Sequence, residues 1–282
     1  MNGFIHYNGQ LIPGDNQVIT ANNRGLRYGD GLFETMKVIN GTVILETLHY
    51  ERLFAGLKTL QMDLPPFLTP GYLSENIRLL CEKNECRLAA RVRLMVVRGD
   101  GNINTVSEPA THIIIQAEPL ANDYFRLNEN GLTIDIYPDA NKSCDKLANL
   151  KSNNYLPYVM AALYAHEKKL DDCLLLNSYN RICDATIANI YWIKNGKIFT
   201  PPLAEGCVAG VMRRYLLELD NEPRITERAL PVEVLFEADE ICFTNALFGM
   251  RWVKQFRNKT YSNTIITELY NRHIKNMPGC QP

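Results

Sequence analysis

The chain has 282 residues, of which 46% are hydrophobic and 22% are charged, and its formal net charge is −1. This is the composition of a globular protein with one large domain or two of ordinary size. The near-zero charge provides no global field to attract nucleic acid or anionic lipid, and no apolar run approaches the length of a membrane span.

Cysteine and histidine usage indicates the compartment and argues against a metal. The eight cysteines include no Cys-x-x-Cys pair, and the five histidines include no pair four residues apart. A chain of this length can build a full core without disulfides, so we expect reduced, buried thiols in a cytoplasmic protein. The N-terminal residues 1–5 lack the basic and apolar regions of a signal peptide. We expect no metal site.

The first part of the chain predicts a β-rich unit with two helices. Asn8-Gly9 and Asn40-Gly41 are turn sequences between apolar segments, and each predicts a hairpin. Residues 91–97 alternate charged and apolar side chains, which is typical of a half-buried strand. Further strands are expected over residues 4–12 (as a hairpin), 28–39, 42–45 and 111–117, and helices over residues 50–60 and 71–86.

The second part alternates strands and helices. We expect residues 118–122 to connect a small α/β domain, 1–117, to a larger domain, 123–282. Strands are predicted over residues 132–137, 173–176, 181–184, 187–194, 197–199 and 240–244, and helices after Pro157 and over residues 208–219 and 263–275.

Lys151 lies just before an apolar run with helical spacing that begins at Leu156. Pro157 falls at the first turn of that predicted helix, a position that suits proline. A lysine held on the approach to a helix can be partly desolvated, which favours the free amine that attacks carbonyl groups. For a lone lysine, a surface role is the ordinary interpretation. Other segments of the chain decide between a reactive lysine and a surface lysine.

Four segments occur in a fixed order, and together they resemble one enzyme family. They are Tyr28-Gly29-Asp30-Gly31-Leu32-Phe33-Glu34-Thr35, His49-Tyr50-Glu51-Arg52-Leu53, Lys151-Ser152-Asn153-Asn154-Tyr155-Leu156 and Asp184-Ala185-Thr186-Ile187-Ala188-Asn189. In this order and spacing the chain resembles the class IV, or fold type IV, pyridoxal-phosphate enzymes. That family holds branched-chain aminotransferases, D-amino-acid aminotransferases and aminodeoxychorismate lyases.

The resemblance implies a fold, a cofactor and an assembly. The fold is the two-domain α/β (α+β) fold of D-amino-acid aminotransferases, with pyridoxal 5′-phosphate in a cleft between the domains. The resemblance also implies a homodimer in which the small domain helps to close the partner's site.

The resemblance also assigns residues. Lys151 is expected to hold the cofactor as a Schiff base and to shuttle the proton; Lys146, its nearest rival, lacks an adjoining helix. Arg52 is expected to grip the cofactor phosphate, for which a guanidinium fork is suited. The remaining cofactor contacts implied are Tyr155 with the phenolic oxygen and the backbone amides of Val211, Met212, Asn245 and Ala246 with the phosphate.

Asp184 is a departure, because the family usually has glutamate at this position. A carboxylate here keeps the pyridine nitrogen protonated and so makes the ring an electron sink. Aspartate supplies the same charge on an arm one methylene shorter. The alternative is an ordinary turn aspartate, for which the residue type is common.

The function predicted is a pyridoxal-phosphate-dependent aminotransferase that acts on an amino acid, branched-chain or D-amino-acid-like, and a 2-oxo acid. Three alternatives stay open: aminodeoxychorismate lyase, a cofactor-binding homologue without activity, and a structural α/β protein. Candidate substrate residues are Arg98 and Arg251 as carboxylate anchors, and Phe33 and Trp252 as walls of the pocket.

Overall fold

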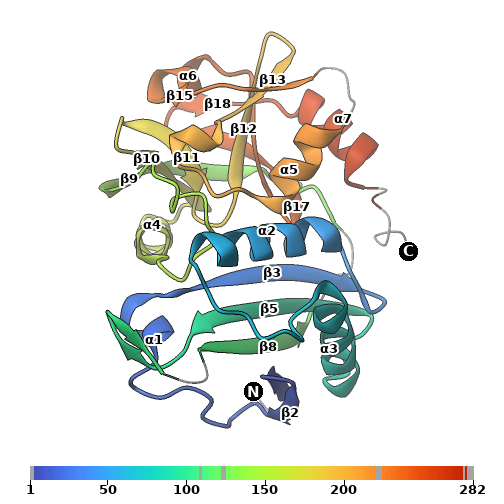
Figure 1. Ribbon diagram of the computed structural model, residues 1–282. Coiled ribbons are helices and arrows are strands. Elements are labelled where there is room, and N and C mark those ends of the chain that lie inside the picture. Colours follow the sequence, from blue (N-terminus) through green and yellow to red (C-terminus); the bar gives the residue numbers. More distant parts are fainter. Residues whose placement is uncertain (1–2, 108–109, 122–124, 220–223, 276, 278–282) are drawn as a thin grey trace.

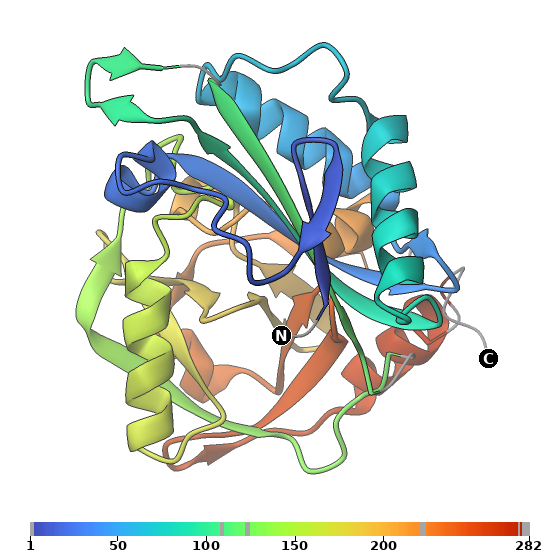
Figure 2. The same cartoon turned by 90° about the horizontal axis from the view of Figure 1, so that it is seen from below.

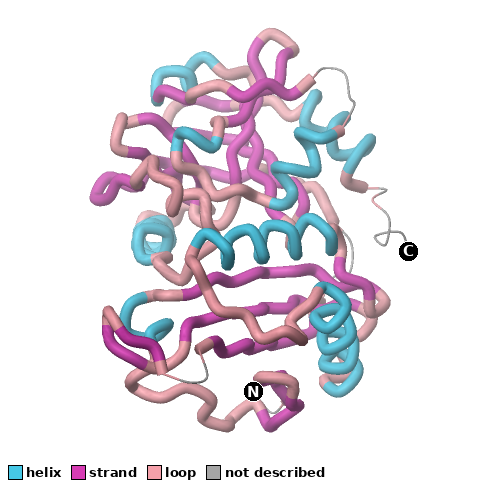
Figure 3. Tube along the Cα trace, in the orientation of Figure 1, coloured by secondary structure: helices cyan, strands magenta, loops and turns pink. Residues whose placement is uncertain are grey.

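The computed structural model describes residues 3–107, 110–121, 125–219, 224–275 and 277. Two large β-sheets dominate the structure, one built from residues 4–119 and the other from residues 132–260 (Figure 1). Helices and strands are mixed in both halves, as Figure 3 shows. The predicted mixture of helix and strand is therefore confirmed, whereas the division into domains 1–117 and 123–282 stays a prediction.

The first sheet is antiparallel throughout, with strand order β2-β1-β8-β5-β3-β4. Its strands are β1 (Phe4–Tyr7), β2 (Gln10–Pro13), β3 (Gly31–Ile39), β4 (Thr42–Val43), β5 (Ala89–Arg98) and β8 (Thr111–Pro119). A separate hairpin of β6 (Gly101–Asn102) and β7 (Thr105–Val106) follows β5, and the helices are α1 (Arg24–Tyr28), α2 (Glu46–Thr59) and α3 (Pro70–Lys83).

The two predicted hairpins form because their turns contain residues that accept positive φ. Asn8 and Gly9 have φ of 46° and 94°, and Asn40 and Gly41 have φ of 51° and 79°. Two successive positive φ angles match the right-handed twist of the flanking strands, which is why Asn-Gly is favoured there. Both turns set the register of the first sheet.

The core of the first half lies between its sheet and the apolar faces of α2 and α3. From the predicted stripe of α2, Tyr50, Leu53 and Leu57 are buried in this core. Thr69 caps α3, because its side chain accepts a hydrogen bond from the backbone of Tyr72. In Figure 1, α2 lies between the first sheet and the second half of the chain, so its other face is available to the second half.

The second sheet has the strand order β14-β13-β12-β16-β17-β9-β10-β11-β15, and β18 pairs with β17. Its strands are β9 (Leu132–Lys142), β10 (Asp172–Asn177), β11 (Arg181–Ala185), β12 (Asn189–Lys194), β13 (Lys197–Thr200), β14 (Ile225–Glu227), β15 (Leu230–Pro231), β16 (Glu240–Asn245), β17 (Gly249–Phe256) and β18 (Lys259–Thr260). Its helices are α4 (Leu156–Glu167), the short 3₁₀ helix η1 (Leu203–Glu205), α5 (Val211–Glu218), α6 (Val232–Glu237) and α7 (Thr264–His273).

Several boundaries differ from those predicted. Tyr28 belongs to α1 and not to the strand expected over residues 28–39, and β8 and α5, which bear on the site, differ as follows. The strand β8 continues through Pro119, opposite Ala90, so the chain leaves the first sheet later than residue 118. The helix α5 begins at Val211 and not at residue 208, because Gly210 is extended at the N-cap and the amide of Ala209 binds the carbonyl oxygen of Asn149. The helices α1 and α6, the strand β17 and the short strands β6, β7, β14, β15 and β18 were not predicted.

The structure bears on three expectations drawn from the composition, namely reduced thiols, no membrane span and no metal site. Seven cysteines are free thiols, and Cys280 lies outside the described residues. Within the described ranges, no helix is long and apolar enough to cross a membrane, and no cluster of three His, Cys, Asp or Glu side chains could hold a metal. The cytoplasmic location stays a prediction.

Truncation of Leu57 is expected to destabilise the first half strongly. Its side chain is fully buried between α2 and the first sheet, so Leu57→Ala leaves a cavity that costs about 2–5 kcal/mol. Leu88 is the matched control, since it is 76% exposed and Leu88→Ala should change stability by less than about 0.5 kcal/mol. Urea unfolding of both variants measures the difference, and equal losses would contradict this description of the core.

Candidate active site

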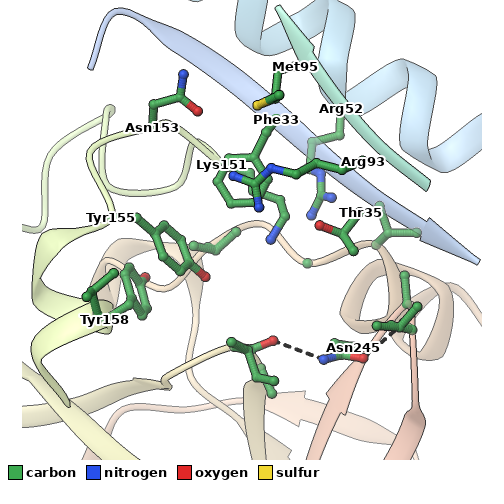
Figure 4. Close-up of a pocket in the computed structure, with 18 of the residues that line it drawn as sticks. Phe33, Thr35, Arg52, Arg93, Met95, Lys151, Asn153, Tyr155, Tyr158 and Asn245 are labelled. Atoms are coloured by element: carbon green, nitrogen blue, oxygen red, sulfur yellow. Dashed lines mark hydrogen bonds between the residues drawn. The ribbon is translucent and has the colours of Figure 1, made fainter. Parts of the chain in front are cut away.

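A cavity of about 580 Å³ lies where the first sheet meets the second half of the chain. Its volume is within the range typical of small-molecule sites. Side chains from β3, α2 and β5 form one wall, and the segment around Lys151, the end of β11 and the start of α5 form the other. Figure 4 shows Lys151, Arg52 and Arg93 projecting toward the same space.

Lys151 is held in place by the edge of β3. The amide of Phe33 binds the carbonyl oxygen of Lys151 at 3.0 Å, and the amide of Asn153 binds the carbonyl oxygen of Gly31 at 3.0 Å. These bonds continue β3 with a short antiparallel bridge between Leu32 and Ser152. The lysine is therefore fixed by a strand of the first sheet, although it lies far from that strand along the chain.

The amine of Lys151 lies in an environment that favours its neutral form. Its Nζ is 4.5 Å from the centre of the Phe33 ring and 5.6 Å from that of Tyr155. It has no hydrogen bond or ion pair with any residue that the structure describes. Burial, followed by the positive charge of Arg52, lowers the pKa of Lys151 to about 8. With this pKa roughly a tenth of the amine is neutral and nucleophilic at pH 7, far more than for an ordinary lysine.

Arg52 is oriented by a buried charged network. Its Nε donates to Glu34 at 2.8 Å, and Nδ1 of His49 lies 2.7 Å from the same carboxylate. Burial alone would raise the pKa of Glu34, but Arg52 and His49 lower it to about 2. The remaining arm of Arg52 donates to the carbonyl oxygen of Ala209 at 3.0 Å, beside the start of α5. This network fixes the guanidinium at the wall of the cavity.

The start of α5 and the loop after β16 offer backbone amides to the same region. The first-turn amides of a helix, here those of Val211 and Met212, have no partner within the helix and attract anions. Asn245 fixes the other loop, because its side chain accepts from the amides of Leu247 and Phe248 at 2.9 and 2.8 Å. The arrangement suits an anionic group beside Arg52.

Asp184 is buried at the opposite wall and is surrounded by donors. One oxygen, Oδ2, accepts from Lys142 Nζ at 2.9 Å, from the Tyr158 hydroxyl at 2.7 Å and from the amide of Val208 at 3.0 Å. The other oxygen, Oδ1, accepts from Asn189 at 3.0 Å. The aspartate therefore does more than close a turn, since it joins several segments at the cavity wall.

Tyr155 lines the cavity between Lys151 and Asp184. Its ring stacks on Tyr158 with centroids 4.2 Å apart, and its hydroxyl donates to the carbonyl oxygen of Thr186 at 3.4 Å. Burial raises the pKa of Tyr155, so it remains a neutral phenol.

Most of the predicted site residues lie together. The cavity is lined by Phe33, Arg52, Lys151, Tyr155, Asp184, Val211, Asn245 and Ala246. The side chain of Met212 is buried in the core, so only its backbone is near the site. The rival Lys146 is exposed outside the cavity.

Three of the predicted substrate residues lie elsewhere. Arg98 donates from Nε to Asp30 at 2.9 Å and from its other nitrogens to the carbonyl oxygens of Leu60 and Gln61, so it ties β5 to α2. Arg251 is exposed and lies over the ring of Phe248. Trp252 donates to the carbonyl oxygen of Asn128. None of the three is among the residues that line the cavity.

Arg91 and Arg93 line the cavity instead, and neither was among the predicted site residues. They alternate with the buried Val92 and Leu94 on β5, so both face away from the core of the first half. Burial, followed by the neighbouring Arg91, lowers the pKa of Arg93, and its guanidinium lies 4.2 Å from the Phe33 ring centre. The alternation recognised over residues 91–97 contained this signal.

Comparisons with known proteins identify the family. Residues 31–256 match the family described as Amino-transferase class IV. The chain is 31% identical to an aminodeoxychorismate lyase of Vibrio harveyi, over 82% of this chain and 85% of that protein. It is also 27% identical to a putative branched-chain-amino-acid aminotransferase of Methanocaldococcus jannaschii, over 94% of this chain and 92% of that protein.

A solved structure shows the same fold. The T.th. branched-chain amino acid aminotransferase with pyridoxamine 5′-phosphate superposes with a TM-score of 0.88 at 18% identity, covering 100% of this chain and 96% of that one. The predicted fold type IV is therefore confirmed, and the chain belongs to the class IV aminotransferase family. It is an enzyme of that family, and the alternative of a purely structural α/β protein is wrong.

The lowered pKa of Lys151 predicts its reactivity. In the protein without ligand, the rate of attachment of a water-soluble aromatic aldehyde to Lys151 should rise about tenfold per pH unit below pH 7 and level off above pH 8. Borohydride reduction and peptide mapping at each pH measure it, and Lys151→Ala must lose this label. A rate that still climbs steeply between pH 9 and 10 would contradict the lowered pKa.

Proposed function

We propose that this protein is a pyridoxal 5′-phosphate-dependent aminotransferase that passes an amino group between an amino acid and a 2-oxo acid. The observation that carries the proposal is the position of the Lys151 amine, which lies in one cavity with the Arg52 guanidinium and the Asp184 carboxylate. These three groups suit the aldehyde, the phosphate and the ring nitrogen of that cofactor. The related T.th. structure holds pyridoxamine 5′-phosphate, which supports this choice.

The residues present fit such a group. The amine has no hydrogen-bond partner among the described residues, so no internal bond has to break before it attacks an aldehyde. Gly210 leaves room beside α5, since a Cβ there would lie 1.8 Å from Oδ1 of Asn189. The backbone before α5 can therefore pass close to Asn189, which donates a hydrogen bond to Asp184, only because this residue is glycine.

Each residue then has a defined task. When bound, pyridoxal 5′-phosphate supplies an electron sink for the pair left behind when a proton leaves the substrate's α-carbon. Lys151 Nζ would hold the cofactor through its aldehyde and would carry that proton. Arg52 and the amides of Val211, Met212, Asn245 and Ala246 hold the phosphate. Asp184 would supply the negative charge beside the ring nitrogen, and the hydroxyl of Tyr155 would donate a hydrogen bond to the phenolic oxygen of the cofactor.

The enzyme is proposed to act as a homodimer, with the exposed apolar face of α4 as supporting evidence. The apolar residues whose helical spacing predicted this helix do not pack inward, because Tyr158, Ala161 and Ala165 form its buried face. Seen from below, α4 lies at the outside of the molecule beside β9 (Figure 2). The residues left exposed on it are Leu156, Val159, Met160 and Leu163. A second copy would remove this surface from water.

The half-reaction tests the proposed activity. A branched-chain or other common amino acid, of L or D configuration, is expected to remove the visible absorbance of the protein reconstituted with pyridoxal 5′-phosphate, and a 2-oxo acid is expected to restore it. Lys151→Ala serves as the control that cannot react. Absorbance that no amino acid changes would overturn the aminotransferase, and would leave either a lyase or a cofactor-binding protein without activity.

Arg91 and Arg93 favour aminodeoxychorismate lyase as a second candidate. Among the described residues, neither arginine has an ion pair with a carboxylate, although both line the cavity. Asp184 is the one acidic residue among the described residues of that lining, and Lys142 already pairs with it. A substrate with a second carboxylate would supply the missing negative charge, and aminodeoxychorismate has two. An acidic amino acid would meet the same requirement in the aminotransferase.

Arg93→Met is expected to raise the KM of a substrate with two carboxylates by about ten- to a hundredfold, since charge-assisted hydrogen bonds contribute about 1.5–3 kcal/mol. The KM of leucine should change much less. Arg91→Met, measured in parallel, shows whether the more exposed arginine also contributes to binding the second carboxylate. Pyruvate release from aminodeoxychorismate, measured on the same variants, separates the lyase from the aminotransferase. An equal effect on both substrate classes would assign Arg93 a structural role.

A further inference from the structure

Behind the cavity wall, a buried lysine contacts the carboxylate of Asp184. Lys142 ends β9 and is 8% exposed, and it is not among the residues that line the cavity. Its Nζ donates to the Asp184 carboxylate at 2.9 Å and to the carbonyl oxygen of Gly206 at 2.6 Å, and it also contacts the hydroxyl of Tyr158. The three protons of the ammonium therefore have three acceptors.

The two carboxylate oxygens of Asp184 differ in how many hydrogen-bond donors they contact. Oδ2 accepts from Lys142, from Tyr158 and from the amide of Val208, so its capacity is filled. Oδ1 accepts only from Asn189 among the described residues and retains room for another donor. The side chain of Asp184 is thus held through Oδ2, and Oδ1 is the oxygen with capacity left for another donor.

A counterion is required for Asp184 to stay ionised in this position. The carboxylate is 2% exposed, and burying an isolated charge is so unfavourable that such a group takes up a proton instead. Lys142 is the cation in direct contact with it. Lys151 acts on the carboxylate only through space, and its own charge is lost near pH 8.

We infer that Lys142 is a positioning residue that keeps Asp184 charged and turned toward the cavity, and that the activity depends on this pair and not on Asp184 alone. The inference rests on the proposed function, because the charge of Asp184 matters only to a group bound in the cavity. The pair also accounts for the use of aspartate here. A short side chain whose Oδ2 accepts three hydrogen bonds has little freedom to rotate.

Several titratable groups surround Asp184, and their contributions must be separated from that of Lys142. They are Lys142 on β9, Tyr155 just before α4, Tyr158 on α4, Cys183 on β11, and Lys151 and Cys207 in the flanking loops. Burial raises the pKa of both tyrosines and both thiols, so they stay neutral near pH 7. The charge of Asp184 raises the pKa of Lys151, so a variant that removes this charge also affects Lys151, and variants of Lys142 that keep and remove the charge must be compared with each other.

Turnover, and its rescue by a variant that keeps the charge, test the role in the reconstituted enzyme. Asp184→Asn and Lys142→Met are each expected to lower turnover about a hundredfold at pH 7, and the double variant no further. Lys142→Arg keeps a cation beside Oδ2 of Asp184 and should retain much more of the turnover than Lys142→Met, whereas a purely structural role would not distinguish the two by charge. Lys146→Met, in an exposed lysine of the same segment, should match wild type.

The melting temperature of the protein without cofactor tests the pair independently of activity. Each single variant leaves one group buried without its partner and should lower the melting temperature by about 5–10 °C. The double variant removes both charges and should melt above both single variants.

Two results would overturn the inference: wild-type turnover in Lys142→Met, or additive losses of melting temperature in the double variant. An enzyme in which even the wild type shows no turnover would instead refute the proposed function, while the melting temperatures would still report on the pair.

Discussion

The cavity depends on the hydrogen bonds and ion pair of Arg52, which hold its walls together. The guanidinium starts on α2, binds Glu34 on β3 and reaches the carbonyl oxygen of Ala209 just before α5. One side chain thereby connects the first sheet, its covering helix and the second half of the chain. Because Glu34 and His49 are buried, these bonds form in a medium of low dielectric constant, where their geometry is strongly enforced.

The position of Lys151 follows from the same contact between the two halves. Its segment extends the edge of β3 through backbone hydrogen bonds, so the nucleophile is placed by a strand of the first half and belongs in sequence to the second. Close packing on the rings of Phe33 and Tyr155 removes water from the amine. Position and reactivity of the lysine therefore have one cause, which is the meeting of the two halves.

The basic side chains of the cavity face its interior, and the nearby acidic side chains are paired with basic residues. Cationic groups face the space directly, from Arg52, Arg91, Arg93 and Lys151, whereas the acids Glu34 and Asp184 are each bound to a basic partner. The outcome is a site with an excess of positive charge inside a protein of net charge −1. An anionic cofactor and substrate are favoured by that local field and not by the charge of the whole molecule.

The hairpins, the longer helices and the residues with a local signature could be predicted from the order of the amino acids alone. Asn-Gly turns, the apolar stripe of α2 and the Lys151 segment depend on neighbours a few residues away, so they could be read from the chain. The order of four motifs was enough to indicate the family. The partners of Arg98, Arg93 and Asp184 could not be predicted, because strand pairing and the contact between the two halves of the chain bring together residues far apart in sequence. The alternation of residues along β5 identified its two faces but not which of them meets the second half of the chain. The contact between Lys142 and Asp184 joins residues that are 42 positions apart in the sequence, so no local pattern could have indicated it.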